Sequence, residues 1–295
     1  MLNVLITGAG GQLGRELQRL AALSPNCYVA TDVAELDIAD SGAVDRALHE
    51  GRFDVVVNCA AFTDVEGAEA DPEGADRLNH IGAANLAAAA AQTGATLIHL
   101  STDYVFDGSS VVPYTEQMPA APLSVYGRTK WAGEEAVRTS GCKYLIFRTS
   151  WLYSEYGHNF LKTMLRLMVE RDEVRVVCDQ IGTPTYAGDL ALALFSMIEG
   201  RLYAGQEGTY HFSNEGVASW YDFAVGIARA AGHDRCRIIP CRSDEYPARA
   251  LRPACSVLDK SKARHTFGLD IPHWSESMLY CLGRLGALKK DESQL

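Results

Sequence analysis

Short apolar runs alternate with helix-like stretches through the first half of the chain. Runs at 3–7, 27–31, 54–59, 96–100 and 143–148 have the length of buried strands. The stretches between them place apolar residues three or four positions apart, as Leu13, Leu17 and Leu20 do, which is typical of a helix with one buried face. Strands that alternate with helices of crossover length predict an α/β fold with a parallel, doubly wound sheet.

A glycine turn joins the first predicted strand to its helix. Gly8, Gly11 and Gly14 follow the strand directly. Glycines let the backbone approach a pyrophosphate without Cβ clashes, and a helix N-terminus offers free N–H groups to a phosphate. Strand, glycine turn and helix in this order predict a Rossmann-type dinucleotide site. The alternative is a glycine-rich connection that binds no ligand.

Asp32 directly follows the second predicted strand. It lies 18 residues after Gly14, close to the ~20 typical of the acid that binds an adenosine ribose. A carboxylate at this place favours NAD and opposes a 2′-phosphate. The alternative is an ordinary loop aspartate. Asp37 and Ile38 come shortly afterwards and are placed to border the adenine.

Polar side chains follow the fourth predicted strand at Thr102 and Asp103. Ligands of open α/β sheets gather at the carboxyl ends of the strands, so these side chains mark the edge of a site. The Thr102 hydroxyl can donate to a carbonyl oxygen, and the Asp103 carboxylate can hold sugar hydroxyls. The competing interpretation is that Thr102 only caps a turn.

Tyr126 and Lys130 lie four residues apart in a predicted helix, so both side chains share one face. A cation beside a phenol favours the phenolate, and we expect Lys130 to lower the pKa of Tyr126. Such a tyrosine can exchange a proton with a developing alkoxide. The pair alone is weak evidence, because composition gives ~0.3 such matches by chance and two surface side chains would look the same.

Composition and charge narrow the function classes. The formal net charge of −10 argues against a nucleic-acid partner, which requires a basic face. The eight cysteines form no pattern at metal-ligand spacing, so we expect reduced thiols in a cytoplasmic protein. The N-terminal residues do not resemble a signal peptide, and no apolar stretch approaches the ~20 residues that cross a membrane.

Four motifs resemble the extended short-chain dehydrogenase/reductase superfamily. They occupy residues 7–14, 58–61, 101–106 and 126–130. More narrowly, the chain resembles the dTDP-4-dehydrorhamnose reductase family in the longer segment 101–108 and in three further segments, at 147–153, 159–160 and 179–185. The resemblance extends from Met1 to about Trp274, and it implies reduction of a C4 ketone by NADPH or NADH, the last step of dTDP-L-rhamnose synthesis.

The resemblance also assigns residues. It places Tyr126, Lys130 and Thr102 in catalysis, with Tyr126 as the proton donor and Lys130 also at the nicotinamide. Substrate contacts fall on Thr102, Asp103, Trp151 and Arg252, where Arg252 would bind the nucleotide pyrophosphate. The remaining cofactor contacts, including the glycine turn, are Gly8, Gly11, Gln12, Leu13, Gly14, Asp32, Asp37, Ile38, Ala61, Phe62, Thr63 and Leu100. A core tryptophan and a solvated arginine are the alternatives for Trp151 and Arg252.

The expected organisation is two interleaved regions. Residues 1–150 form an NAD(P)-binding Rossmann domain that regains elements from about 174–200, and residues 151–295 form a smaller, mostly substrate-binding region. Partners are expected to be a dTDP-sugar, with neither nucleic acid nor membrane. Some members of the family form a Mg²⁺-dependent dimer; the sequence shows no carboxylate cluster for that metal, so no metal ligand is assigned and a homodimer remains open.

Two other functions compete with the reductase. One is a nucleotide-sugar epimerase or dehydratase of the same superfamily. The dehydratases place an acid directly after the Thr-Asp pair, where this chain has Tyr104. The other is a non-catalytic NADP-binding regulatory subunit that resembles that of methionine adenosyltransferase.

Overall fold

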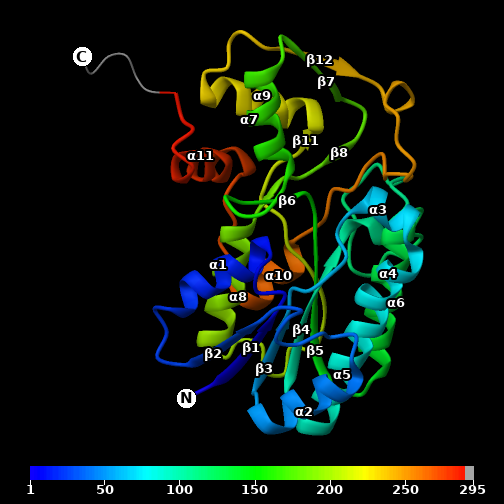
Figure 1. Cartoon of the computed structure of the whole chain (residues 1–295), viewed down its shortest axis with the longest axis vertical. Coiled ribbons are helices and arrows are strands. Elements are labelled where there is room, and N and C mark those ends of the chain that lie inside the picture. Colours follow the sequence, from blue (N-terminus) through cyan, green and yellow to red (C-terminus); the bar gives the residue numbers. More distant parts are fainter. Residues whose placement is uncertain (290–295) are drawn as a thin grey trace.

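A six-stranded parallel sheet forms the centre of the computed structural model, which describes residues 1–289 (Figure 1). The strand order is β10-β5-β4-β3-β1-β2, and every neighbouring pair is parallel. The strands are β1 (Asn3–Thr7), β2 (Cys27–Thr31), β3 (Val55–Asn58), β4 (Thr96–Thr102), β5 (Lys143–Thr149) and β10 (Gly208–His211). The predicted Rossmann-type, doubly wound sheet is confirmed.

Helices cover both faces of this sheet. On one face α1 (Gln12–Ala21), α8 (Ala187–Glu199) and α10 (Ser261–Phe267) share a core with the strands. The other face carries α2 (Ser41–Gly51), α5 (Gly82–Thr93) and α6 (Val125–Thr139) over a second core. Short segments α3 (Val65–Ala70), α4 (Pro72–Asp76) and the π-helical turn η1 (Arg77–Ile81) lead into α5.

A smaller region lies above the carboxyl ends of the strands in Figure 1. It contains α7 (Phe160–Glu170), α9 (Trp220–Ala231), α11 (Trp274–Arg284) and the two-stranded sheet of β7 (Glu173–Val177) and β12 (Arg237–Cys241). These elements bury a separate core that includes Met164, Phe223 and Cys281. Two short pairs connect the regions: β6 (Leu152–Tyr153) with β9 (Thr185–Tyr186), and β8 (Ile181–Gly182) with β11 (Ala218–Ser219).

The chain returns to the main sheet at other places than the sequence analysis expected. Within 174–200, α8 packs against the sheet, but β7 pairs with β12 in the smaller region. β7 therefore belongs to the smaller region, because its buried residues Val174 and Val176 face the second core. The main sheet instead gains β10 beside β5, with α10 packed in the same core.

Three properties of the described residues, 1–289, bear on the earlier expectations. All eight cysteines lie in this range and are free thiols. Within it, no group of three or more metal-ligating side chains converges on one point. No helix in it combines the length and the apolar character that a membrane crossing requires.

The glycine turn after β1 is packed against its own backbone. Gly8 has a φ of +66°, and a Cβ there would lie 2.5 Å from the backbone nitrogen of Ala60. A Cβ on Gly14 would lie 2.5 Å from the Gly8 carbonyl oxygen and 2.7 Å from the Ala9 Cα. These two glycines are therefore required by close approach within the protein as well as by any ligand.

We expect Gly14→Ala to lower the free energy of unfolding by about 2 kcal/mol, because the new methyl group meets rigid backbone atoms. Gly226→Ala is the matched control. Its Cβ would meet the Met278 side chain at 3.4 Å in an ordinary contact, and alanine stabilises a helix interior by about 0.5–1 kcal/mol relative to glycine. Urea unfolding of both variants checks the prediction, and equal effects of the same sign would contradict it.

Candidate active site

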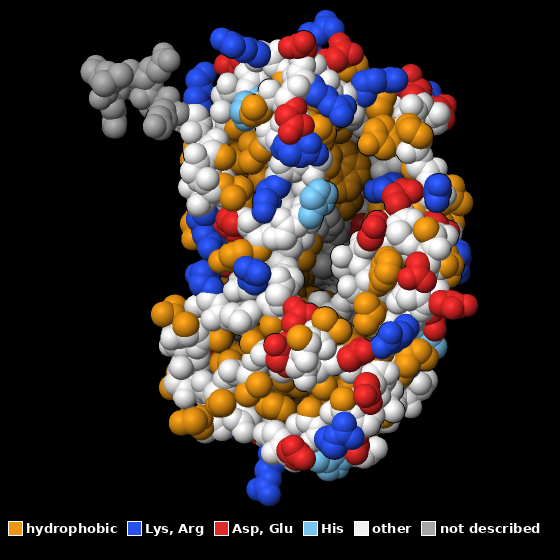
Figure 2. Space-filling model, in the orientation of Figure 1, with side chains coloured by type: hydrophobic (Ala, Val, Ile, Leu, Met, Phe, Trp, Pro, Cys, Tyr) orange, Lys and Arg blue, Asp and Glu red, His pale blue; other side chains and the backbone are white. Residues whose placement is uncertain are grey.

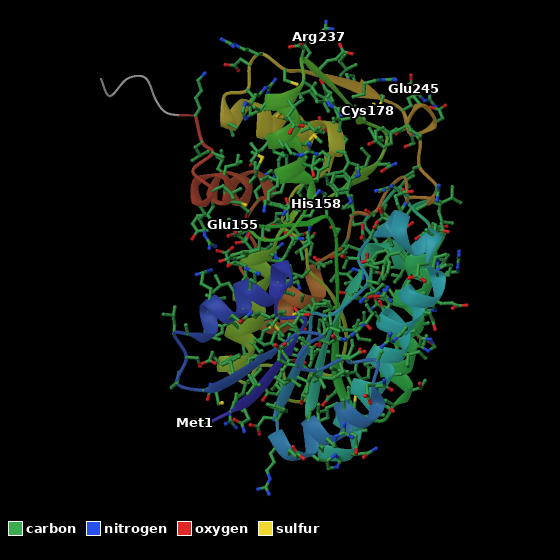
Figure 3. All side chains as sticks on the ribbon, in the orientation of Figure 1. Met1, Glu155, His158, Cys178, Arg237 and Glu245 are labelled. Carbon is green, nitrogen blue, oxygen red and sulfur yellow. The ribbon has the colours of Figure 1, made fainter. Side chains whose placement is uncertain are left out.

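A cavity of about 560 Å³ opens at the carboxyl ends of the strands, beneath the smaller region. Figure 2 shows the surface hollowed between that region and the helices beside it. His158, labelled in Figure 3, lies in its wall between the two regions. The sequence-predicted residues in the cavity wall are Gly11, Gln12, Leu13, Gly14, Ala61, Thr63, Leu100, Thr102, Asp103, Tyr126, Lys130, Trp151 and Arg252.

Five predicted cofactor residues do not line this cavity: Gly8, Asp32, Asp37, Ile38 and Phe62. Each has a structural contact that accounts for its position. Asp32 lies beside the glycine turn and accepts the N–H of Gly10 at 2.7 Å. Asp37 pairs with Arg77 at 2.5 Å, Ile38 is buried against Gly82, and the Phe62 N–H donates to Asn79 at 2.8 Å.

The N-terminus of α1 faces the cavity through Gly11, Gln12 and Leu13. Gly11 is the N-cap residue and supplies no side-chain cap. The N–H groups of a first helical turn have no partner within the helix, so this turn offers donors and a positive dipole end to an anion. The arrangement fits the pyrophosphate of a dinucleotide.

Helix α6 carries Tyr126 and Lys130 into the same cavity. Ser124 caps the helix by accepting the N–H of Gly127 at 3.1 Å, which fixes where the helix starts. A Cβ on Gly127 would lie 2.3 Å from the Tyr104 carbonyl oxygen, so glycine allows α6 to approach the end of β4. Lys130 is buried, and its Nζ donates to the Leu100 carbonyl at 2.5 Å.

The expected effect of Lys130 on Tyr126 is wrong. Loss of solvent raises the pKa of the Tyr126 phenol, opposed by the Thr102 hydroxyl, and Lys130 is not among the groups that shift it. Burial lowers the pKa of Lys130 to about 8, because the ammonium loses its hydration. At neutral pH Tyr126 therefore keeps its proton and is poised to donate it.

Thr102 and Asp103 form a buried polar pair at the end of β4. The Thr102 hydroxyl accepts the Tyr104 N–H at 3.2 Å, which caps the 3-10 turn η2 (Asp103–Val105), and it donates to Asp103 Oδ1 at 3.0 Å. Among the described residues, Asp103 Oδ2 has no hydrogen-bond partner. Burial raises the pKa of Asp103 to about 6, against nearby hydroxyls that favour the carboxylate.

Two tryptophans form one wall. Trp151 stacks on Trp220 with ring centroids 3.6 Å apart and planes 8° from parallel. Its backbone has a φ of +48°, which is unusual for a large side chain, and its ring lies where a Cβ on Gly182 would be. Trp220 therefore covers a face of the Trp151 ring that the sequence analysis left open to a sugar.

Arg252 lies where this cavity meets a second one of about 270 Å³. Its guanidinium pairs with Glu66 at 3.0 Å and is partly exposed. Trp220 also lines both cavities. The second cavity has apolar walls with a few polar groups, and its other lining residues include Phe160, Met164, Gln180, Ser243 and Tyr246.

Thr149 and Trp220 line the cavity but were not singled out from the sequence. The Thr149 hydroxyl lines the cavity, is buried and has no partner in the described part of the chain. It is the register partner of Thr102, so the adjacent predicted strand ends contained this signal. Trp220 begins α9 and looks like an ordinary apolar helix residue in the sequence, so no local pattern distinguishes it.

The fold and the glycine turn define a dinucleotide-binding protein of the doubly wound α/β class. A family model described as "RmlD substrate binding domain" matches residues 2–286. The chain belongs to this family.

The similar proteins cover nearly the whole chain. A curated dTDP-4-dehydrorhamnose reductase of Aggregatibacter actinomycetemcomitans is 41% identical over 287 residues, which are 94% of this chain and 97% of the relative. A crystal structure of a dTDP-4-dehydrorhamnose reductase from Clostridium acetobutylicum has a TM-score of 0.92 and 43% identity, covering 96% and 99% of the two chains. The Bacillus anthracis enzyme of that name, crystallised with NADP, has a TM-score of 0.90, 40% identity and the same coverage.

The raised pKa of Asp103 predicts a pH-dependent stability effect. The pKa of Asp103 rises from its ordinary 3.8 to about 6 in the folded protein. The contribution of this group to stability is therefore fully present below pH 3.8, and it is lost as the pH rises through about 6. Asp103→Asn removes the buried charge while keeping an acceptor for Thr102. We expect it to raise the unfolding free energy at pH 8 by on the order of 2–3 kcal/mol relative to the wild type, with the gain vanishing below pH ~4.

Urea unfolding between pH 4 and pH 8 measures this difference. Asp270→Asn serves as the control, because Asp270 is exposed and its replacement should change stability little at any pH. A gain for Asp103→Asn that does not vary with pH would contradict the interpretation.

Proposed function

We propose that this chain reduces the C4 ketone of dTDP-4-dehydro-6-deoxy-L-mannose, which is dTDP-4-dehydrorhamnose, to dTDP-L-rhamnose, with NADPH or NADH as reductant. One observation carries the proposal: Thr102, Tyr126 and Lys130 line the same cavity as the uncapped N-terminus of α1. The family membership and the names of the relatives supply the substrate.

The residues available for the dinucleotide lie on both sides of the cavity. The first turn of α1 would bind the pyrophosphate, and Lys130 with the orphan hydroxyl of Thr149 would hold the nicotinamide end. When bound, the reduced nicotinamide supplies the hydride. Asp32 remains the proposed ribose contact, and its Oδ2 already orients the Gly10 N–H of the glycine turn.

The chain's own contribution is to position the ketone and supply a proton. Negative charge develops on the C4 oxygen as the ketone is reduced, and Tyr126 donates its proton to that oxygen. The Thr102 hydroxyl, which opposes the rise in the Tyr126 pKa, would orient the phenol. Lys130 lines the same cavity with a buried side chain and would hold the nicotinamide ribose.

The second cavity adjoins the first at Arg252 and Trp220, and it could hold the base of a nucleotide. Its apolar walls suit a base, and Arg252 at the junction suits the diphosphate between base and sugar. Trp151 would then contact the sugar with the part of its ring that Trp220 leaves free, and Asp103 Oδ2 would accept a sugar hydroxyl.

The homodimer remains a prediction.

Tyr104 is the observation that favours reduction over dehydration. It occupies the position directly after Thr102 and Asp103, and its ring packs edge-on against Tyr126 at 5.4 Å and 75°. Burial raises the pKa of Tyr104 to about 12, so it is neutral where the dehydratases have an acid. This neighbour shields the Tyr126 phenol from water without competing for the proton.

We expect Tyr126→Phe to lower kcat by about 10²–10⁴-fold, because the proton donor is lost while the ring keeps its packing. Cofactor affinity should change little, since the phenyl ring retains the shape of the wall. Turnover is measured as the loss of NADPH or NADH absorbance in the presence of dTDP-4-dehydrorhamnose. Cofactor binding is measured by the quenching of tryptophan fluorescence. Full turnover of the variant in a chemistry-limited step would exclude Tyr126 as the donor.

We expect Arg252→Gln to raise KM for the dTDP-sugar about tenfold or more and to leave kcat within about twofold, because a diphosphate contact binds substrate and transition state alike. Steady-state kinetics check the split. Arg264→Gln is the control, since Arg264 pairs with Glu215 outside both cavities. An unchanged KM for Arg252→Gln would remove Arg252 from the substrate site.

A further inference from the structure

Glu134 is a fully buried carboxylate on the helix that carries Tyr126 and Lys130. The three residues are spaced four apart, so they occupy successive turns on one face of α6. Sequence reasoning stopped at the tyrosine and the lysine. An ionised side chain without solvent is costly unless it is paired, so the contacts of Glu134 need an explanation.

Both neighbouring strands donate to this carboxylate. Arg148 of β5 binds it with two nitrogens, Nε at 2.9 Å and Nη2 at 2.8 Å, and Ser101 of β4 donates its hydroxyl at 2.5 Å. Ser101 and Arg148 are register partners, so the sheet presents both donors side by side. Arg138, one turn further along α6, also pairs with Glu134 and is partly exposed.

The contact with Ser101 continues the contact made by Lys130. Leu100 and Ser101 are consecutive in β4: the Leu100 carbonyl accepts from Lys130, and the Ser101 hydroxyl donates to Glu134. Two successive turns of α6 are therefore fastened to two successive residues of β4. Thr102 comes next in the strand, so the same fastening sets the distance between Thr102 and the helix that carries Tyr126.

The negative charge of Glu134 also acts on the Lys130 ammonium. The titratable groups that act on the Lys130 ammonium are Glu134 from α6 and Cys59 from the end of β3. Cys59 is a buried thiol whose pKa burial raises to about 12, so it carries no charge at neutral pH. His99 of β4 is buried, and desolvation together with Lys130 and Arg138 lowers its pKa well below its usual value. The charge of Glu134 therefore opposes, in part, the lowering of the Lys130 pKa by burial.

We propose that Glu134 is a positioning residue for the reduction: it fastens α6 to the sheet beside Thr102 and so sets where Tyr126 and Lys130 meet the cavity. The inference rests on the proposed function for the role of Lys130 in turnover. The placement and charge of Lys130 can be measured without turnover, so failure of one proposal is distinguishable from failure of the other.

The direct test is an NMR titration of the full-length protein labelled with ¹³C at the lysine Cε. The Lys130 signal is assigned by its absence in Lys130→Met. In Glu134→Gln we expect the Lys130 pKa to fall by about one unit, because removing a nearby negative charge destabilises the ammonium. Glu135→Gln is the matched control: Glu135 is the next residue, is half exposed and also pairs with Arg138, and its loss should leave the Lys130 titration unchanged.

The pH profile of kcat supplies the second readout. In Glu134→Gln its alkaline limb should move to lower pH by the same unit as the NMR titration, which a purely structural loss of activity would not produce. In Ser101→Ala the charge of Glu134 remains but the fastening to β4 is lost, so kcat should fall about tenfold with the Lys130 pKa nearly unchanged. This second variant leaves no buried charge unpaired and tests the fastening if Glu134→Gln does not fold.

Two results overturn the inference: an unchanged Lys130 titration in folded Glu134→Gln, or full turnover of Ser101→Ala. An inactive wild type in the ketosugar assay, with the Lys130 titration shifted as expected, would instead reject the proposed function and leave the placement of Glu134 intact.

Discussion

The hydrogen bond from the buried Lys130 ammonium to the Leu100 carbonyl is the contact on which the arrangement of the site depends. It joins the centre of α6 to the end of β4 at 2.5 Å. Tyr126 lies one helical turn before this contact, and Thr102 lies two residues beyond it in the strand. Once the helix is held there, the phenol and the threonine hydroxyl must meet over the same cavity.

Burial and charge oppose each other throughout this wall. Loss of water raises the pKa of Tyr126 and Asp103 and lowers that of Lys130, so each group is driven toward its neutral form. Neighbouring polar groups counter this tendency only in part. A neutral phenol suits a proton donor. Burying the ionisable groups of Lys130 and Asp103 lowers stability, and such perturbed pKa values are typical of functional sites.

The fold was predictable because its signals are periodic and local. Buried strands, crossover helices and the glycine turn can all be recognised in the sequence, and five of the six strands of the main sheet were anticipated. Strand β10 was not, because Gly208–His211 is short and lacks an apolar run. The place of β7 could not be predicted either, since an alternating strand does not reveal which core its apolar side faces.

The site was predictable where residues act through spacing along the chain, as Tyr126 and Lys130 do. It was not predictable where residues act through tertiary contact, as Trp220 does when it comes to Trp151 from a distant helix. The predicted direction of the Tyr126 pKa shift was wrong for a similar reason. Sequence spacing shows which residues are neighbours, but it does not show the burial that raises this pKa.

The central claim is that hydride passes from the reduced nicotinamide to C4 of the ketosugar, and a deuterium label measures this transfer most directly. The full-length protein is incubated with dTDP-4-dehydrorhamnose and reduced nicotinamide that carries deuterium at its transferable position, and the product is examined by NMR. The account predicts dTDP-L-rhamnose with one deuterium at C4. Product without deuterium at C4, or a ketosugar left unchanged with both NADPH and NADH, would contradict it.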